Sequence, residues 1–231
     1  EYFRGSCWYA REFETPRQPL PGGRVYVEVL AAGQQAKVYV NGQPAGEHQG
    51  GYSLFRADVT ELCKKDGPNL LCINCSNEHS DSVYPQMADF TFYGGLYRGV
   101  NIICVANTRF DLDYMGGLGL DVISAPFEGG RARFQMKSFI TNPGPDYTVY
   151  YSVLDKEGRE LTGGLRPSES PDTELWVDDA RLWSPDDPYL YTVQASILRR
   201  NETVDQVTVK AGVRSFSVDP QRGFILNGQP L

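Results

Sequence analysis

The sequence predicts an all-β protein, and three observations support that fold class. Apolar and polar residues alternate with a period of two in several segments, which is typical of strands that bury one face. Glycine and proline number 24 and 15, an excess that favours short strands joined by tight turns. No strand pattern is followed by a long helical pattern, so we expect no parallel βαβ units.

The alternation is clearest near the start of the chain. Residues 24–29 place three valines on one face of a predicted strand. The next predicted strand, 36–40, ends at the pair Asn41-Gly42, which is the strongest short signal for a hairpin turn. The other predicted strands are 69–75, 99–105, 131–141, 147–154, 189–198 and 203–213.

A polar stretch divides the predicted strands into two groups. Residues 107–119 contain several glycines and follow the strand that ends at Val105, so we expect a domain boundary there. Each half then has the size of a β-sandwich of about 100 residues. Only 58–65 has a helical pattern, and it predicts one turn capped by Asp58 or Thr60. The predicted parts are 1–106, 107–217 and a separate final segment, 218–231.

The final segment contains a second hairpin signal. Asn227-Gly228 is flanked by apolar residues, which promises a returning strand. Leu231, the last residue, is the only apolar residue after the pair. The sequence therefore predicts a hairpin left incomplete, in a chain cut from a longer polypeptide.

Charge and cysteine content exclude some classes of partner. The chain has 22 basic and 29 acidic side chains and a net charge of −7, whereas a nucleic-acid binder needs clustered Lys and Arg. No apolar run approaches the roughly 18 residues of a membrane helix, so we expect no membrane partner. The five cysteines cannot all pair within the chain, which favours a reducing, cytoplasmic location.

Cys72 and Cys75 form a C-x-x-C pattern that is followed by His79. Such a pattern is used by thiol redox centres and by zinc sites. A redox pair needs a helix N-terminus, and a zinc site needs further ligands at comparable spacing. Here the pair lies in a predicted strand, where residues three apart face opposite sides. The sequence favours inert thiols, with no Cys72–Cys75 disulfide.

The segment 89–98 is the best candidate for chemistry. It combines Asp89 with four aromatic residues and a Gly-Gly pair, after a long polar loop. A carboxylate accepts hydrogen bonds from sugar hydroxyls, and aromatic rings cover the C–H face of a sugar. The structural alternative is a strand that buries Phe90 and Phe92, with Asp89 in a turn or paired with Arg98. Composition alone leaves both interpretations open.

Four motifs, in order along the chain, resemble glycoside hydrolase family 2. Residues 38–60 resemble part of that family's sugar-binding domain, and 89–100 are similar to its motif D-F-T-x-Y-G-G-[IL]-Y-R-D-V. Gly99 stands where the motif has Asp. The other two, 182–191 and 212–230, resemble the family's immunoglobulin-like domain and the lead-in to its catalytic barrel.

The resemblance implies a jelly-roll sugar-binding domain followed by an immunoglobulin-like β-sandwich, with a (β/α)₈ barrel beyond Leu231. The barrel of the family carries the two catalytic glutamates of retaining hydrolysis. It implies no catalytic residue in this chain, and one substrate-binding residue, Asp89, which reaches the mouth of the barrel. Arg98 and His48 are expected to be structural.

The resemblance is strongest to bacterial β-galactosidases, because β-glucuronidases of the family tend to have N-Y-A-G where this chain has 92–95. We therefore expect part of a retaining exo-β-galactosidase, inactive without its barrel. The alternatives are a β-glucuronidase, a β-mannosidase or a free-standing carbohydrate-binding module. Expected partners are a β-galactoside, the barrel of the same polypeptide and, as an open question, further copies of the chain. No cofactor is expected in this chain; Na⁺ or Mg²⁺ is left open for the longer enzyme.

Overall fold

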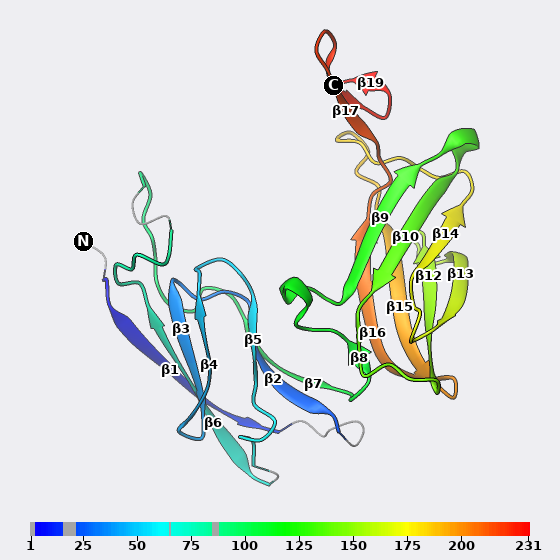
Figure 1. Ribbon diagram of the computed structural model, residues 1–231. Coiled ribbons are helices and arrows are strands. Elements are labelled where there is room, and N and C mark those ends of the chain that lie inside the picture. Colours follow the sequence, from blue (N-terminus) through cyan, green and yellow to red (C-terminus); the bar gives the residue numbers. More distant parts are fainter. Residues whose placement is uncertain (1–2, 16–21, 65, 85–87) are drawn as a thin grey trace. The chain divides into compact units, whose positions relative to one another are not determined.

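The computed structural model describes residues 3–15, 22–64, 66–84 and 88–231. The chain divides into two compact units, Glu1–Asn107 and Thr108–Leu231, which are described separately below. In the described part of the chain, every element is a strand except two short 3₁₀ turns, η1 (Tyr114–Gly116) and η2 (Glu128–Gly130). The predicted all-β fold is therefore confirmed (Figure 1).

Unit 1 is a sandwich of two antiparallel sheets, with strand orders β1-β6-β3-β4 and β5-β2-β7 (Figure 1). The predicted strands at 24–29, 36–40, 69–75 and 99–105 are all present, with ends shifted by at most one residue. The strands are β1 (Ser6–Glu14), β2 (Arg24–Val29), β3 (Gln35–Val40), β4 (Gln43–Gln49), β5 (Phe55–Asp58), β6 (Pro68–Ser76) and β7 (Val100–Val105).

The core of unit 1 follows from alternation along its central strands. In β2 the three valines are fully buried, and on the opposing sheet Val38, Val40 and Ile73 are at most 2% exposed. Asn41 and Gly42 both have positive φ, 52° and 81°, so they form the predicted two-residue hairpin turn between β3 and β4.

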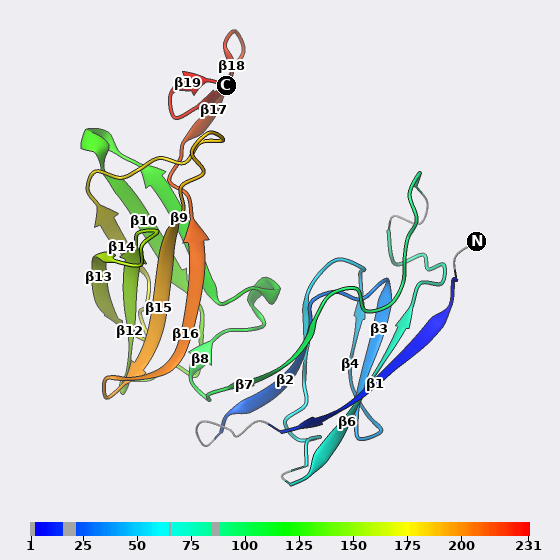
Figure 2. The same cartoon turned by 180° about the vertical axis from the view of Figure 1, so that it is seen from behind.

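Unit 2 is a second sandwich, with sheets of order β14-β10-β9 and β13-β12-β15-β16 (Figure 2). Its smaller pairings are β11-β8 and β17-β18-β19. The strands are β8 (Arg109–Phe110), β9 (Leu120–Pro126), β10 (Ala132–Ser138), β11 (Ile140–Thr141), β12 (Tyr147–Leu154), β13 (Glu160–Pro167), β14 (Thr173–Val177), β15 (Tyr191–Arg199), β16 (Glu202–Ala211), β17 (Phe216–Asp219), β18 (Gly223–Leu226) and β19 (Gln229–Pro230).

The core of unit 2 is built from large side chains that face each other across the two sheets. Phe134 and Tyr191 pack edge to face with ring centroids 5.4 Å apart, and Met136 and Tyr151 are completely buried. The Tyr151 hydroxyl keeps a partner because it donates a 2.6 Å hydrogen bond to Oγ of Ser138, itself buried. Ser138 lies on β10 and Tyr151 on β12, so this satisfied polar pair specifies how the two sheets pack against each other.

Two predicted elements differ from the structure. The predicted strand 131–141 is broken at Phe139, whose N–H donates to Gly119 and whose carbonyl accepts from Asp111, so the chain leaves β10 there. The predicted incomplete hairpin is wrong: Ile225 pairs with Pro230, so β18 and β19 close it around Asn227-Gly228. A two-residue strand is enough because both turn residues have positive φ.

The predicted helical segment 58–65 is a single turn. The amide of Cys63 donates to the carbonyl of Val59, and the amide of Thr60 donates to Oδ1 of Asp58, which therefore provides the cap. Lys65 lies outside the described residues. The turn is short because residues 68–76 resume the strand pattern at once.

The buried hydroxyl of Tyr151 gives a stability prediction. We expect Tyr151→Phe to lower the free energy of unfolding at pH 7 by about 1–2 kcal/mol, because it leaves the Ser138 hydroxyl without its donor. Burial raises the pKa of Tyr151 from 10.0 to about 12. An unfolded chain loses this proton first, so the wild type loses its advantage as the pH rises from 10.0 towards 12.

Denaturant unfolding at pH 7 and at pH 11 measures both effects. Tyr150→Phe is the matched control, because Tyr150 lies on the same strand as Tyr151 and its hydroxyl donates a hydrogen bond to Glu160 at the surface. Equal destabilisation by the two variants at pH 7 would contradict the role given to the buried pair.

Candidate functional site

The long connection between β6 and β7 carries the predicted sugar-binding segment. It lies at the end of unit 1 where β6 ends and β3 begins (Figure 2). Gly33 and Gly95 exchange two backbone hydrogen bonds of 3.0 Å, which join this connection to the residues just before β3. The segment is therefore fixed to the sheet by main-chain contacts, although it is not itself a strand.

Glycine is required at these contacts because the chains approach closely. A Cβ atom on Gly33 would lie 2.9 Å from the carbonyl oxygen of Tyr93. Gly95 has a φ of +85°, and a Cβ atom there would collide with the hydroxyl of Tyr9. A Cβ atom on Gly94 would lie 2.8 Å from Cγ of Asn77. The Gly-Gly pair is thus explained by packing rather than by flexibility.

Asn77 is the buried support of this region. It is 4% exposed, its Oδ1 accepts a 2.8 Å bond from the amide of Gly5, and its Nδ2 donates to the carbonyl of Phe3 at 3.1 Å. One side chain therefore ties the segment before β1 to the start of the connection. No sequence pattern predicted this role, since an Asn in a polar loop resembles a surface residue.

The end of the connection is held by side-chain to backbone contacts. The Tyr97 hydroxyl donates to the carbonyl of Gly51, and Nη1 of Arg98 donates to the carbonyl of Tyr52 at 3.2 Å. The amide of Leu30 donates to the carbonyl of Gly99 at 3.0 Å. Arg98 thus serves as a backbone clamp, as expected from the sequence, and its guanidinium lies 5.5 Å from the centre of the Tyr97 ring.

Asp89 lies at the other end of the same segment and is exposed. Among the described residues, no hydrogen bond or ion pair engages its carboxylate, and it is not paired with Arg98. Nearby in the sequence, Phe92 is buried at 5% exposure, whereas Phe90 and Tyr93 are 59% and 74% exposed. The alternative of a strand that buries both phenylalanines is therefore wrong.

His48 is structural by its contacts. Its ring stacks on Phe55 with centroids 4.5 Å apart, and Nε2 lies 3.0 Å from Oγ of Ser53. Burial lowers the pKa of His48 below its ordinary value of 6.5, against the opposing effect of a backbone hydrogen bond at Gly50. These contacts make His48 a packing residue of β4.

The C-x-x-C pair does not form a site. Cys72 and Cys75 belong to opposite faces of β6, where Cys75 shares the buried face with Leu71 and Ile73, and the described structure contains no disulfide. In the described part of the chain, no three His, Cys, Asp or Glu side chains gather as a metal site.

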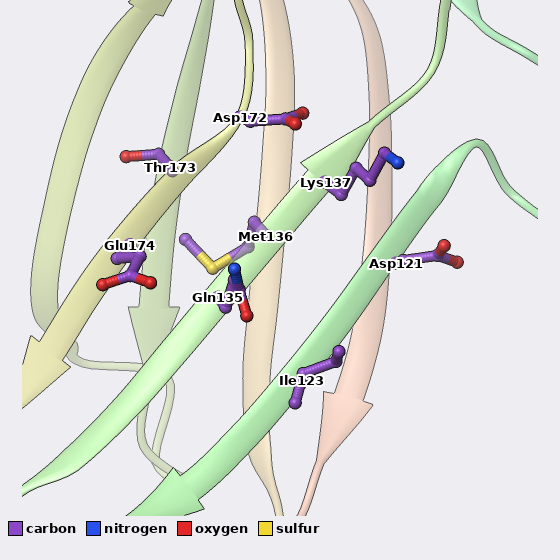
Figure 3. Close-up of a pocket in the computed structure, with 8 residues that line it drawn as sticks. All are labelled: Asp121, Ile123, Gln135, Met136, Lys137, Asp172, Thr173 and Glu174. Atoms are coloured by element: carbon purple, nitrogen blue, oxygen red, sulfur yellow. The ribbon is translucent and has the colours of Figure 1, made fainter.

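A hollow of about 360 Å³ lies on the sheet β14-β10-β9 of unit 2 (Figure 3). It is lined by polar side chains from three strands, but its acidic residues do not gather at one point: Asp121 lies on β9 and Glu174 on β14, with β10 between them. It offers no arrangement of groups for catalysis.

The described part of the chain contains no helix with the length and apolar character of a membrane span.

Two family models match the chain. "Glycosyl hydrolases family 2, sugar binding domain" matches residues 2–105, and "Glycosyl hydrolases family 2" matches residues 128–214. These ranges fall within unit 1 and unit 2 respectively.

Curated relatives with two different activities match the whole chain. A β-glucuronidase of Bacteroides fragilis is 29% identical over 100% of the chain, which covers 34% of that protein. A β-galactosidase of Thermoanaerobacter pseudethanolicus is also 29% identical over 100% of the chain, which covers 31% of it. The chain thus spans about a third of the length of these relatives.

Solved structures divide in the same way. An FMN-binding β-glucuronidase from Facaelibacterium prausnitzii L2-6 has a TM-score of 0.96 and 53% identity, over 99% of this chain and 36% of that one. A putative β-galactosidase from Bacteroides fragilis has a TM-score of 0.88 and 25% identity, over 100% of this chain and 36% of that one. The chain therefore belongs to glycosyl hydrolase family 2, of which it comprises the sugar-binding domain and the immunoglobulin-like domain.

Proposed function

We propose that this chain is the non-catalytic part of a retaining β-glucuronidase, in which unit 1 helps to form the sugar subsite. The observation that carries the proposal is the 53% identity with a β-glucuronidase over 99% of the chain. The matched β-galactosidases are 25–29% identical over nearly the same length. Identity over two whole domains weighs more than the few residues at 92–95 that favoured a β-galactosidase.

A β-galactosidase is kept as the second candidate. It is supported by Phe92-Tyr93-Gly94-Gly95, which resembles the β-galactosidase form of the motif, and by a relative of that activity at 29% identity. The structure gives three of these four residues packing reasons, since Phe92 is buried and both glycines are in close contact. They therefore say more about how the loop is held than about which sugar it meets.

Within either activity, we assign Asp89 to substrate binding. Its carboxylate is exposed and has no partner in the described part of the chain, although the residues after it are tied to the sheet. A carboxylate presented in this way can accept hydrogen bonds from two hydroxyls of one sugar. The exposed rings of Phe90 and Tyr93 provide apolar surface close by.

The reaction itself needs groups that the described part of the chain does not supply. Retaining hydrolysis uses an acid/base and a nucleophilic carboxylate about 5–5.5 Å apart. In this family both glutamates belong to the barrel, so we propose that unit 1 contributes binding and orientation only. Hydrogen bonds to sugar hydroxyls that strengthen as the ring flattens lower the barrier without any proton transfer by Asp89.

The first prediction from the proposed function concerns the 231-residue chain by itself. We expect it to hydrolyse neither 4-nitrophenyl β-D-glucuronide nor the corresponding β-D-galactoside above background, because the acid/base and the nucleophile of this family belong to the barrel. Release of 4-nitrophenol measures this directly. Turnover that survives repurification and disappears on mutation of a residue in this chain would contradict the division of labour proposed here.

The second prediction separates the two candidate sugars. For the longer protein that contains this chain, we expect kcat/KM for the glucuronide to exceed that for the galactoside by at least about a hundredfold. A site built to bind the carboxylate of a glucuronide rejects a galactoside, which lacks that group. Both substrates share the 4-nitrophenyl leaving group, so the ratio reports the sugar alone. A ratio in favour of the galactoside would replace the proposal with the second candidate.

The third prediction concerns Asp89 in the longer protein. We expect Asp89→Asn to lower kcat/KM at least about tenfold, equivalent to ~1.4 kcal/mol, through weaker hydrogen bonds in the transition state. The melting temperature should stay within about 1 °C, because the side chain is exposed.

Asp81→Asn is the matched control, since Asp81 is an exposed carboxylate in the same connection. It should leave kcat/KM unchanged. If Asp89→Asn behaves like the control, Asp89 is not in the site. If its melting temperature falls by several degrees, Asp89 is a structural turn residue.

A further inference from the structure

Two cysteines are neighbours on adjacent strands of one sheet in unit 1. In the antiparallel pairing of β1 and β6, Cys7 is directly opposite Cys75. Residues directly opposite in an antiparallel pair project from the same face of the sheet. Cys75 is 1% exposed and Cys7 is half-buried, and both are free thiols.

This register brings the two residues within reach of a covalent link. Directly opposite residues have Cα atoms about 4.5–5.5 Å apart, and disulfides join Cα atoms about 4.4–6.8 Å apart. Their Cβ atoms, about 4.5–5.5 Å apart, must come somewhat closer for a bond to form. The link can therefore form after a small adjustment of the strands, and the strain keeps it reducible.

Both thiols line a cavity that can admit a small reagent. The cavity has a volume of about 200 Å³, and the other lining residues are Tyr9 of β1 and residues of the segment before β1 and of the candidate sugar-binding connection. They include Asn77, Gly94 and Gly95, which fasten that connection to the sheet. A bond between the thiols would join β1 to β6 directly beneath these contacts.

The arrangement singles out one pair among the five cysteines. Cys72 lies on the opposite face of β6, where its neighbours across the sheet are Ala10 and Tyr39. Cys63 and Cys104 pack against the core of unit 1 and do not line the cavity. Cys7 and Cys75 are thus the two thiols that share both a register position and a cavity.

We propose that Cys7 and Cys75 form a reversible disulfide when the protein meets a low-molecular-weight disulfide such as glutathione disulfide. The Cys7 thiolate attacks one sulfur of the reagent and releases one glutathione thiolate. The Cys75 sulfur, as it gives up its proton, then attacks the sulfur of Cys7 and releases the second glutathione thiolate. Two protein thiols are oxidised to one disulfide, and the reagent is reduced to two thiols.

The order of attack follows from burial. Burial, with a smaller contribution from the neighbouring Cys7, raises the pKa of Cys75 to about 11. Cys75 is therefore the weaker nucleophile towards a reagent in solution, and Cys7, which is half-buried, reacts first. The second step is intramolecular, so the closeness of the pair compensates for the small thiolate fraction of Cys75.

The experiment treats the 231-residue chain with glutathione disulfide and maps its peptides without reduction. We expect a crosslinked peptide that joins Cys7 to Cys75, a mass lower by about 2 Da for the two hydrogens lost, and complete reversal by dithiothreitol. Because the bond closes a long loop onto an edge strand, the melting temperature should rise by about 5 °C.

Three variants make the result specific. Cys7→Ser should abolish the crosslink and the rise in melting temperature and, being a half-buried edge position, should fold normally. Cys75→Ser should do the same, although it alters a buried site. Cys72→Ser, on the opposite face, should behave as the wild type. If no Cys7–Cys75 peptide forms, or if Cys7→Ser shows the same loss of about 2 Da and the same rise in melting temperature as the wild type, the proposal is wrong.

Discussion

Two backbone hydrogen bonds between Gly33 and Gly95 connect the candidate sugar-binding segment to the sandwich of unit 1. They require that neither residue carries a side chain. A Cβ atom on Gly33 would collide with the carbonyl oxygen of Tyr93, and one on Gly95 would collide with the hydroxyl of Tyr9. Once this close approach is made, the contacts that follow it in the sequence can form, namely Tyr97 to Gly51 and the amide of Leu30 to Gly99. The position of Asp89 depends on this chain of contacts, since its own side chain is not held by any described residue.

Much of the fold could be predicted from local sequence patterns. The strand Arg24–Val29 and the hairpin at Asn41-Gly42 were predicted because alternation and turn chemistry are properties of a few adjacent residues. The strands Glu160–Pro167 and Ser6–Glu14 were not predicted. The first contains two glycines, and the second is an edge strand with almost every residue exposed, so neither shows the usual alternation. Pairing with a partner strand makes them strands: Glu160–Pro167 pairs with the preceding strand Tyr147–Leu154, and Ser6–Glu14 pairs with Pro68–Ser76, which lies far away in the sequence.

The candidate site was predictable in its residues but not in its construction. Asp89 and the Gly-Gly pair were singled out because the composition of the segment is unusual, and the structural role of Arg98 was expected. The support from Asn77, whose contacts reach Gly5 and Phe3, could not be foreseen because it joins residues more than 70 positions apart. The same is true of the register that places Cys7 opposite Cys75. Contacts of this kind depend on which strands become neighbours, and spacing along the chain does not encode that directly.

The two ends of the segment 89–99 differ in what their polar groups do, and this difference limits where a ligand can bind. From Gly95 onwards, backbone and side-chain groups bond the sheet and the neighbouring loop, so they have little capacity left for another molecule. The carboxylate of Asp89 accepts no hydrogen bond from any described residue, and the exposed faces of Phe90 and Tyr93 lie within four residues of it. One carboxylate and two rings on an open surface bind a sugar weakly, because each hydroxyl exchanges one hydrogen-bonding partner for another when it leaves water. Strong binding requires a second surface that encloses the sugar and excludes water. The geometry of unit 1 therefore fits the role proposed for it, one wall of a subsite that a second surface encloses.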